Sequence, residues 1–83
     1  EDEGGHSFRK LVGMEILGVY HNEFIVMVRT ITGRARGVAL FIDQLKHEHI
    51  LGTVAGENAV IVIQESVQYL NQIKNDLEKI AAE

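Results

Sequence analysis

Dense apolar runs separated by a few polar residues form two pairs along the chain. The first pair is Met14–Tyr20 and Phe24–Thr30, and the second is Ile50–Ala55 and Ala59–Ile63. β-Branched residues are frequent in these runs, as is typical of strands. Gly56–Asn58 separates the second pair, and glycine and asparagine favour a tight reversal. The pattern therefore predicts four strands arranged as two hairpins.

A helical period follows each predicted hairpin. In the first helix, which Thr32 is expected to cap, apolar residues recur at steps of three and four at Val38, Phe41, Ile42 and Leu45. Ser66 is expected to cap the last helix, which runs to about Ile80 with an apolar seam at Val67, Leu70, Ile73, Leu77 and Ile80. The order β-β-α-β-β-α predicts an α/β (α+β) two-layer sandwich, in which two helices cover one face of a four-stranded, mainly antiparallel sheet.

The predicted strands are apolar on both faces. Runs such as Val60–Ile63 do not alternate with polar residues, although a sheet with one solvated face should do so. If both helices cover the same face, the other face is a large apolar patch, which predicts self-association. The alternative is a monomer in which one helix packs on each face.

Composition narrows the class of protein. The chain has 83 residues, no cysteine and a net charge of −4, so disulfides and thiolate metal sites are excluded. Its acidic balance argues against a domain that binds nucleic acid by itself. No apolar run is long enough to span a membrane. Residues 1–10 lack an apolar period and are expected to form a linker or flexible arm, which leaves residues 11–83 as one domain.

Candidate chemistry is sparse. The triplet His47-Glu48-His49 straddles the predicted end of a helix, and no second cluster completes a metal shell, so we expect a solvated helix end there. No catalytic triad, phosphate loop or dinucleotide fingerprint is present, which disfavours an enzyme. Arg36 falls in the first turn of a helix, where the dipole disfavours a cation, and Glu57 is a candidate partner for it.

The run ILGTVAGENAVIVI, preceded at the appropriate distance by FIDQL and by VRT-ITG, resembles the C-terminal domain of bacterial arginine repressors. The similarity covers about residues 14–80. It implies a cytoplasmic transcriptional regulator of arginine metabolism whose domains form trimers, two of which stack into a hexamer. It also implies L-arginine as the co-repressor, bound between the trimers, and DNA binding only through an N-terminal winged helix that this sequence lacks. No metal or other cofactor is implied.

The same resemblance implies a set of ligand-facing residues, namely Arg36, Asp43, Thr53, Ala55, Glu57 and Asn58. Asp43 and Thr53 match the family. Arg36 stands where the family has glutamine, and Glu57-Asn58 replaces a pair of aspartates. A guanidinium ligand prefers paired carboxylates. At an effective dielectric constant near 20, a guanidinium about 6 Å from Arg36 is repelled by about 3 kcal/mol.

Two interpretations of this site remain open. In one, the site binds arginine or a related amino acid, and Glu57 and Asp43 accept its positive charge. In the other, Arg36 itself reaches Glu57 or Asp43, so that the domain is a constitutive multimerisation module with a degenerate ligand site. Pterin carbinolamine dehydratases share the order of elements, but His47-Glu48-His49 without proline or tryptophan does not supply their type of active site.

Overall fold

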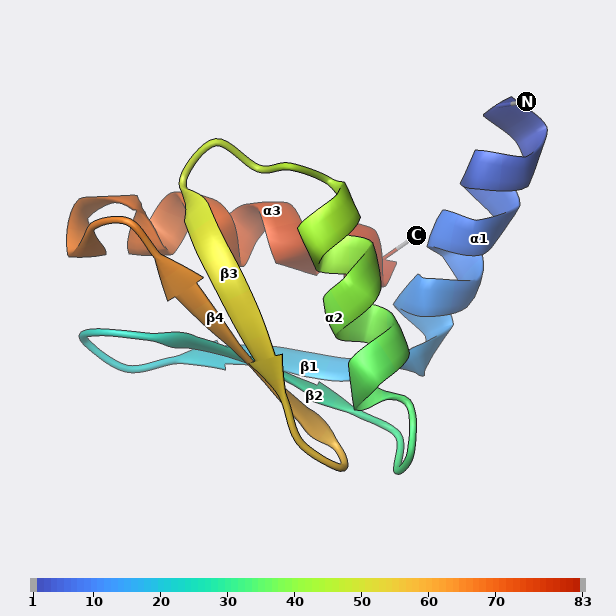
Figure 1. Cartoon of the computed structure of the whole chain (residues 1–83), viewed down its shortest axis with the longest axis horizontal. Coiled ribbons are helices and arrows are strands. Elements are labelled where there is room, and N and C mark those ends of the chain that lie inside the picture. Colours follow the sequence, from blue (N-terminus) through green and yellow to red (C-terminus); the bar gives the residue numbers. More distant parts are fainter. Residues whose placement is uncertain (1, 83) are drawn as a thin grey trace.

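Four strands and three α-helices make up the computed structural model, which describes the backbone of residues 2–82 and the side chains of residues 9–82 (Figure 1). Their bounds, in chain order with one 3₁₀ turn η1, are α1 Asp2–Glu15, β1 Ile16–His21, β2 Val26–Thr30, α2 Ala35–Gln44, β3 Ile50–Ala55, β4 Ala59–Gln64, η1 Val67–Tyr69 and α3 Leu70–Ala82. The two predicted hairpins are β1–β2 and β3–β4, which confirms the order β-β-α-β-β-α from residue 16 onward.

All strand pairs of the sheet are antiparallel, and the strand order is β1-β2-β4-β3. The second strands of the two hairpins therefore lie side by side at the centre. Their register places Val26 opposite Val62 and Val28 opposite Val60. These four valines are fully buried, so β-branched side chains fill the middle of the sheet on its inner face.

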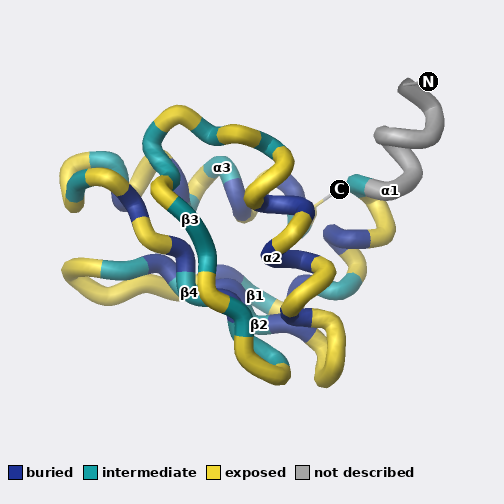
Figure 2. Tube along the Cα trace, viewed as in Figure 1, coloured by how far each residue is buried: buried dark blue, intermediate teal, exposed yellow. Residues whose placement is uncertain are grey.

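Both predicted helices cover this inner face. α2 packs on β3 and β4, whereas α3 packs on β1 and β2. Their apolar stripes, which include Val38, Ile42, Ile73 and Leu77, join the four valines in one core cluster. Figure 2 shows these buried segments gathered in the middle of the molecule. The two-layer architecture with both helices on one face is therefore confirmed.

The opposite face of the sheet is open. Tyr20 lies opposite Met27, Met27 opposite Ile61, and Ile61 opposite Val54, so one apolar row crosses all four strands. Tyr20 and Val54 are more than half exposed, and Ile63 on the same face is 38% exposed. The apolar patch predicted from the two-faced strands is present, and the arrangement with one helix on each face is excluded.

The N-terminal segment differs from its expectation. Residues 2–10, expected to form a linker or flexible arm without an apolar period, belong to the helix α1, and the strand expected from Met14 begins at Ile16. The reason is tertiary packing: α1 packs against α3, and Val12 is buried between them. Residue 1 lies outside the described part of the chain. A linker role for residues 1–10, and residues 11–83 as the domain, stay predictions.

Two smaller expectations about helix starts are wrong. Thr32 does not cap α2: the cap position is Arg34, whose carbonyl accepts a hydrogen bond from the backbone N–H of Val38. The turn from β2 needs a left-handed residue, Gly33, before the helix can begin. Val67 is not part of the apolar seam, because it lies in η1 and is 56% exposed. Ser66 does cap this turn, and its hydroxyl accepts from the N–H of Gln68 at 3.4 Å.

Within residues 2–82, no helix combines the length and the apolar character that crossing a bilayer requires.

The contact between α1 and α3 leads to a first prediction. A Cβ added at Gly13 would collide with the backbone carbonyl oxygen of Ile80, and backbone cannot move aside as a side chain can. Gly13→Ala should therefore lower the free energy of unfolding by about 1–3 kcal/mol in urea denaturation. Gly37→Ala is the matched control: this α2 position has open space around it, so we expect a gain of about 0.4–1 kcal/mol. Equal effects at the two positions would contradict the close helix contact.

Candidate functional site

Three of the implied ligand residues surround one hollow. Arg36 from α2, Ala55 from the end of β3, and Glu57 from the β3–β4 turn line a cavity of about 320 Å³ together with Gly33 and Gly56. The hollow therefore lies where the start of α2 meets the end of β3. It contains one basic and one acidic side chain.

Backbone hydrogen bonds hold the β3–β4 turn against the turn that precedes α2. The N–H of Gly33 donates to the carbonyl of Glu57 at 2.9 Å, and the N–H of Thr30 donates to the carbonyl of Asn58 at 2.9 Å. Gly33 adopts a φ of 86°, a left-handed conformation that glycine tolerates without strain. These bonds fix the distance between Glu57 and the first turn of α2, which carries Arg36.

Arg36 forms no ion pair with either predicted carboxylate. Within the part of the chain whose side chains are described, the only arginine–carboxylate salt bridge at this end of α2 belongs to Arg34, which meets Glu15 at 2.9 Å. Arg36 is exposed and borders the hollow beside Glu57 without a bond to it. The interpretation in which Arg36 serves as a built-in ligand for Glu57 or Asp43 is therefore wrong for this chain by itself.

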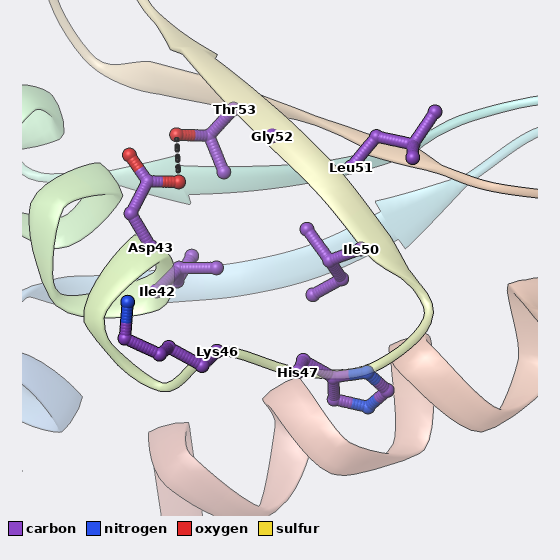
Figure 3. A pocket seen from close by; sticks show the side chains of 8 residues that line it. All are labelled: Ile42, Asp43, Lys46, His47, Ile50, Leu51, Gly52 and Thr53. Atoms are coloured by element: carbon purple, nitrogen blue, oxygen red, sulfur yellow. Dashed lines mark hydrogen bonds between the residues drawn. The ribbon is translucent and has the colours of Figure 1, made fainter.

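A second hollow lies at the other end of the same helix (Figure 3). Asp43 and Thr53 line it with six further residues, and its volume is about 330 Å³. The Thr53 hydroxyl donates to one carboxylate oxygen of Asp43 at 3.0 Å, while the second oxygen of Asp43 has no bond to the residues drawn in Figure 3. Lys46, which has a φ of 54°, and His47 border this hollow as well.

The two hollows follow one seam between α2 and β3. Arg36 and Asp43 are seven residues apart on α2, which is about 10 Å along the helix axis and close to two turns, so they lie on a similar face. Thr53 and Ala55 pair with Val62 and Val60, so both project to the inner side of the sheet, where α2 lies. Five of the six implied residues therefore border this seam. Asn58 does not line either hollow, and its carbonyl fixes the turn.

Two histidines of the α2–β3 loop have a role that the sequence did not indicate. The expected solvated helix end is wrong, because the side chains of His47 and His49 are only 14% and 17% exposed. His47 Nε2 meets Asp76 of α3 at 2.8 Å, and His49 Nδ1 meets Glu65 at 2.9 Å. The loop is thus attached to the C-terminal part of the chain. Each carboxylate lies far from its histidine in sequence, so no local signal could have identified the pairs.

The His49 ring also stacks on the ring of Tyr69, with centroids 3.6 Å apart and planes 5° from parallel. Among the side chains that the structure describes, no group of three or more His, Asp or Glu residues is arranged to hold a metal ion. The histidines thus fix a loop that borders the second hollow.

Comparison with known proteins shows which family the chain belongs to. The family described as "Arginine repressor, C-terminal domain" matches residues 13–79. The chain belongs to this family. An arginine repressor of Chlorobaculum tepidum is 44% identical over 73 residues, covering 88% of this chain and 49% of the relative. The arginine repressor of Prosthecochloris aestuarii is 45% identical over 78 residues, covering 94% of this chain and 53% of the relative.

The family assignment confirms the resemblance drawn from ILGTVAGENAVIVI. The chain spans about half the length of the curated relatives it matches. These relatives are named as repressors and not as enzymes, which agrees with the expectation that the domain is not an enzyme. Family members regulate transcription in arginine metabolism, and the candidate site of this chain departs from the expected residues at Arg36, Glu57 and Asn58.

The loop geometry leads to a second prediction. The backbone N–H of His49 donates to Nδ1 of His47 at 3.1 Å, so Nδ1 must carry a lone pair. Neutral His47 should therefore bear its proton on Nε2, where it donates to Asp76. Nitrogen-15 NMR of the neutral imidazole ring should show the Nε2–H form at His47. His21, whose Nδ1 donates to the carbonyl oxygen of Asn22 at 3.0 Å, should show the opposite Nδ1–H form and is the internal contrast. A dominant Nδ1–H form at His47 would contradict the loop structure.

Proposed function

We propose that this domain is the effector-binding and oligomerisation part of a transcriptional regulator, and that it binds L-arginine or a related amino acid along the α2–β3 seam. The observation that supports this proposal is the placement of two carboxylates, Glu57 and Asp43, in two hollows along one seam. L-Arginine carries two positive groups, its α-ammonium and its guanidinium. Each carboxylate can therefore accept one of them through a charge-assisted hydrogen bond.

Assembly supports the same proposal. The open row of Tyr20, Met27, Ile61 and Val54 is apolar across the full width of the sheet, and such faces in soluble proteins mark interfaces. We expect this face to be covered by further copies of the chain, as a trimer and then as two stacked trimers. The ligand would then bind at the contact between trimers, where a seam that is shallow in one copy is closed by another.

The remaining partners follow from the family. DNA would be bound by a winged helix outside this sequence, because the domain has a net charge of −4, whereas DNA binding relies on positive charge. A cytoplasmic location and the absence of a further cofactor stay predictions. The alternative, a constitutive multimerisation module, retains one supporting observation: Glu57-Asn58 supplies one carboxylate in the β3–β4 turn where the family is expected to have two.

Calorimetry with L-arginine tests the proposed ligand. Asp43→Asn removes one charge from the seam and keeps the shape, so it should weaken L-arginine binding by about tenfold or more, the loss of one charge-assisted hydrogen bond. Glu23→Gln removes the same charge in the exposed β1–β2 turn and should leave the affinity unchanged. Absence of heat from L-arginine at millimolar concentration would contradict effector binding and favour the multimerisation module.

Light scattering after size exclusion tests the assembly surface. The wild-type domain should elute as a trimer or larger at micromolar concentration, and Val54→Lys should shift it toward the monomer, because a charge would be buried against apolar residues. Leu11→Lys is the control, since Leu11 is similarly exposed (57% against 60%) but lies on α1, which packs against α3. A monomeric wild type would contradict this interface.

A further inference from the structure

The loop that joins α2 to β3, residues 45–49, reaches from the second hollow to α3. Lys46 and His47 line this hollow together with Asp43, while Nε2 of His47 donates to a carboxylate oxygen of Asp76 at 2.8 Å. Figure 3 shows the His47 ring next to the ribbon of α3. Because α3 contributes no described residue to either hollow, His47 connects the candidate ligand seam to a helix outside it.

Contacts on both sides of the ring hold His47 in place. Its Nδ1 accepts the backbone N–H of His49 at 3.1 Å, and its Nε2 faces Asp76. His49 is held in turn by Glu65 and by the stacked ring of Tyr69. The backbone N–H of Glu65 also donates to the carbonyl of His49 at 2.9 Å. The loop is therefore fixed by residues that come from the chain after residue 64.

The loop also contains a strained residue. Lys46, directly before His47, has a φ of 54°, in the left-handed region that residues with a Cβ atom rarely adopt. Such a conformation persists only where the surrounding contacts hold it. The contact between His47 and Asp76, which we call the clasp, begins at the next residue and supplies such support. Loss of the clasp would therefore let Lys46 relax and the loop move away from α3.

We infer that the clasp is a regulatory contact: a ligand in the second hollow strengthens it, and α3 passes the change to α1. This inference rests on the proposed function, and it adds how binding at the seam reaches the first helix of the chain. The same loop borders the ligand and holds α3, so a ligand that binds the clasped loop better than the released loop shifts the population toward the clasped form. By linkage, breaking the clasp must weaken binding of that ligand.

The close contact between α3 and α1 provides the second step. Ile80 lies one turn beyond Asp76 on α3, and its carbonyl oxygen is so close to Gly13 of α1 that no Cβ would fit between them. Helices in such close contact do not move independently. A second connection to α1 also exists, because Arg34 before α2 pairs with Glu15 at the end of α1. The experiment must therefore separate the two routes.

Hydrogen exchange followed by mass spectrometry on the assembled domain, with and without saturating L-arginine, tests the clasp. In the wild type, L-arginine should slow amide exchange in residues 45–49, in α3 and in α1 by about fivefold or more, the lower end of typical coupling between sites. Asp76→Ala should remove this slowing in α3 and α1 and weaken L-arginine binding by a similar factor. Asp76→Asn keeps an oxygen that accepts from His47 and should restore most of both effects.

Matched variants make the result specific. Glu78→Gln removes a carboxylate of α3 that pairs with Lys74 on the same helix and should change neither quantity. Arg34→Gln breaks the second connection and should leave the slowing in α3 and α1 intact. His47→Phe keeps a flat ring without either nitrogen and tests the clasp from the loop side if Asp76→Ala does not fold. Urea denaturation identifies a general loss of stability, which speeds exchange with and without ligand alike.

Three outcomes would overturn the inference while L-arginine still binds. They are a wild type without ligand-dependent slowing in α3, slowing in α3 and α1 that persists in Asp76→Ala or His47→Phe, and slowing in α1 that only Arg34→Gln removes. In each case the proposed function stands. A wild type that does not bind L-arginine at millimolar concentration would overturn both.

Discussion

The pairing of β2 with β4 is the interaction on which the rest of the structure depends. It joins the two hairpins, and Val26, Val28, Val60 and Val62 at this pair are fully buried. Both α2 and α3 pack on the surface that these valines help to form. Burying one such side chain contributes about 1.5–3 kcal/mol, which is a large share of the stability of a small domain. A shift of one residue in this pairing would turn the valines to the open face.

The same pairing determines where the charged seam lies. Because β3 is the outer neighbour of β4, α2 packs along the edge of the sheet, and one side of this helix stays open next to the strand. The backbone bonds from Gly33 and Thr30 to the β3–β4 turn then bring Glu57 to the first turn of α2. An exposed arginine and an exposed glutamate at this place lower the folding stability little when they are unpaired, because water solvates both charges. They remain available to a ligand.

The packing of the core also explains why one face of the sheet is left uncovered. Three helices cover one face and one end of the sheet, and they use the apolar residues of α1, α2 and α3 to do so. No described element is left to cover the row from Tyr20 to Val54. A chain of 83 residues without cysteine has a thin core, and oligomerisation is a common way to add buried surface. The proposed assembly would cover the open face of the sheet.

The sequence by itself determined the hairpins, the apolar stripes of α2 and α3, and the strands that are apolar on both faces. Each of these can be read from the spacing of apolar residues within a short segment, which repeats every two residues in a strand and every 3.6 in a helix. Its motif also determined the family, and five of the six candidate site residues do border one seam. Local pattern could not reveal the helix at residues 2–15, since that helix gains its support from α3, which is distant in sequence. It could not show whether Arg36 meets Glu57, or that His47 and His49 meet Asp76 and Glu65. Those contacts join residues far apart in the chain, and only the packing of α2, β3 and α3 decided which charges are paired and which remain open.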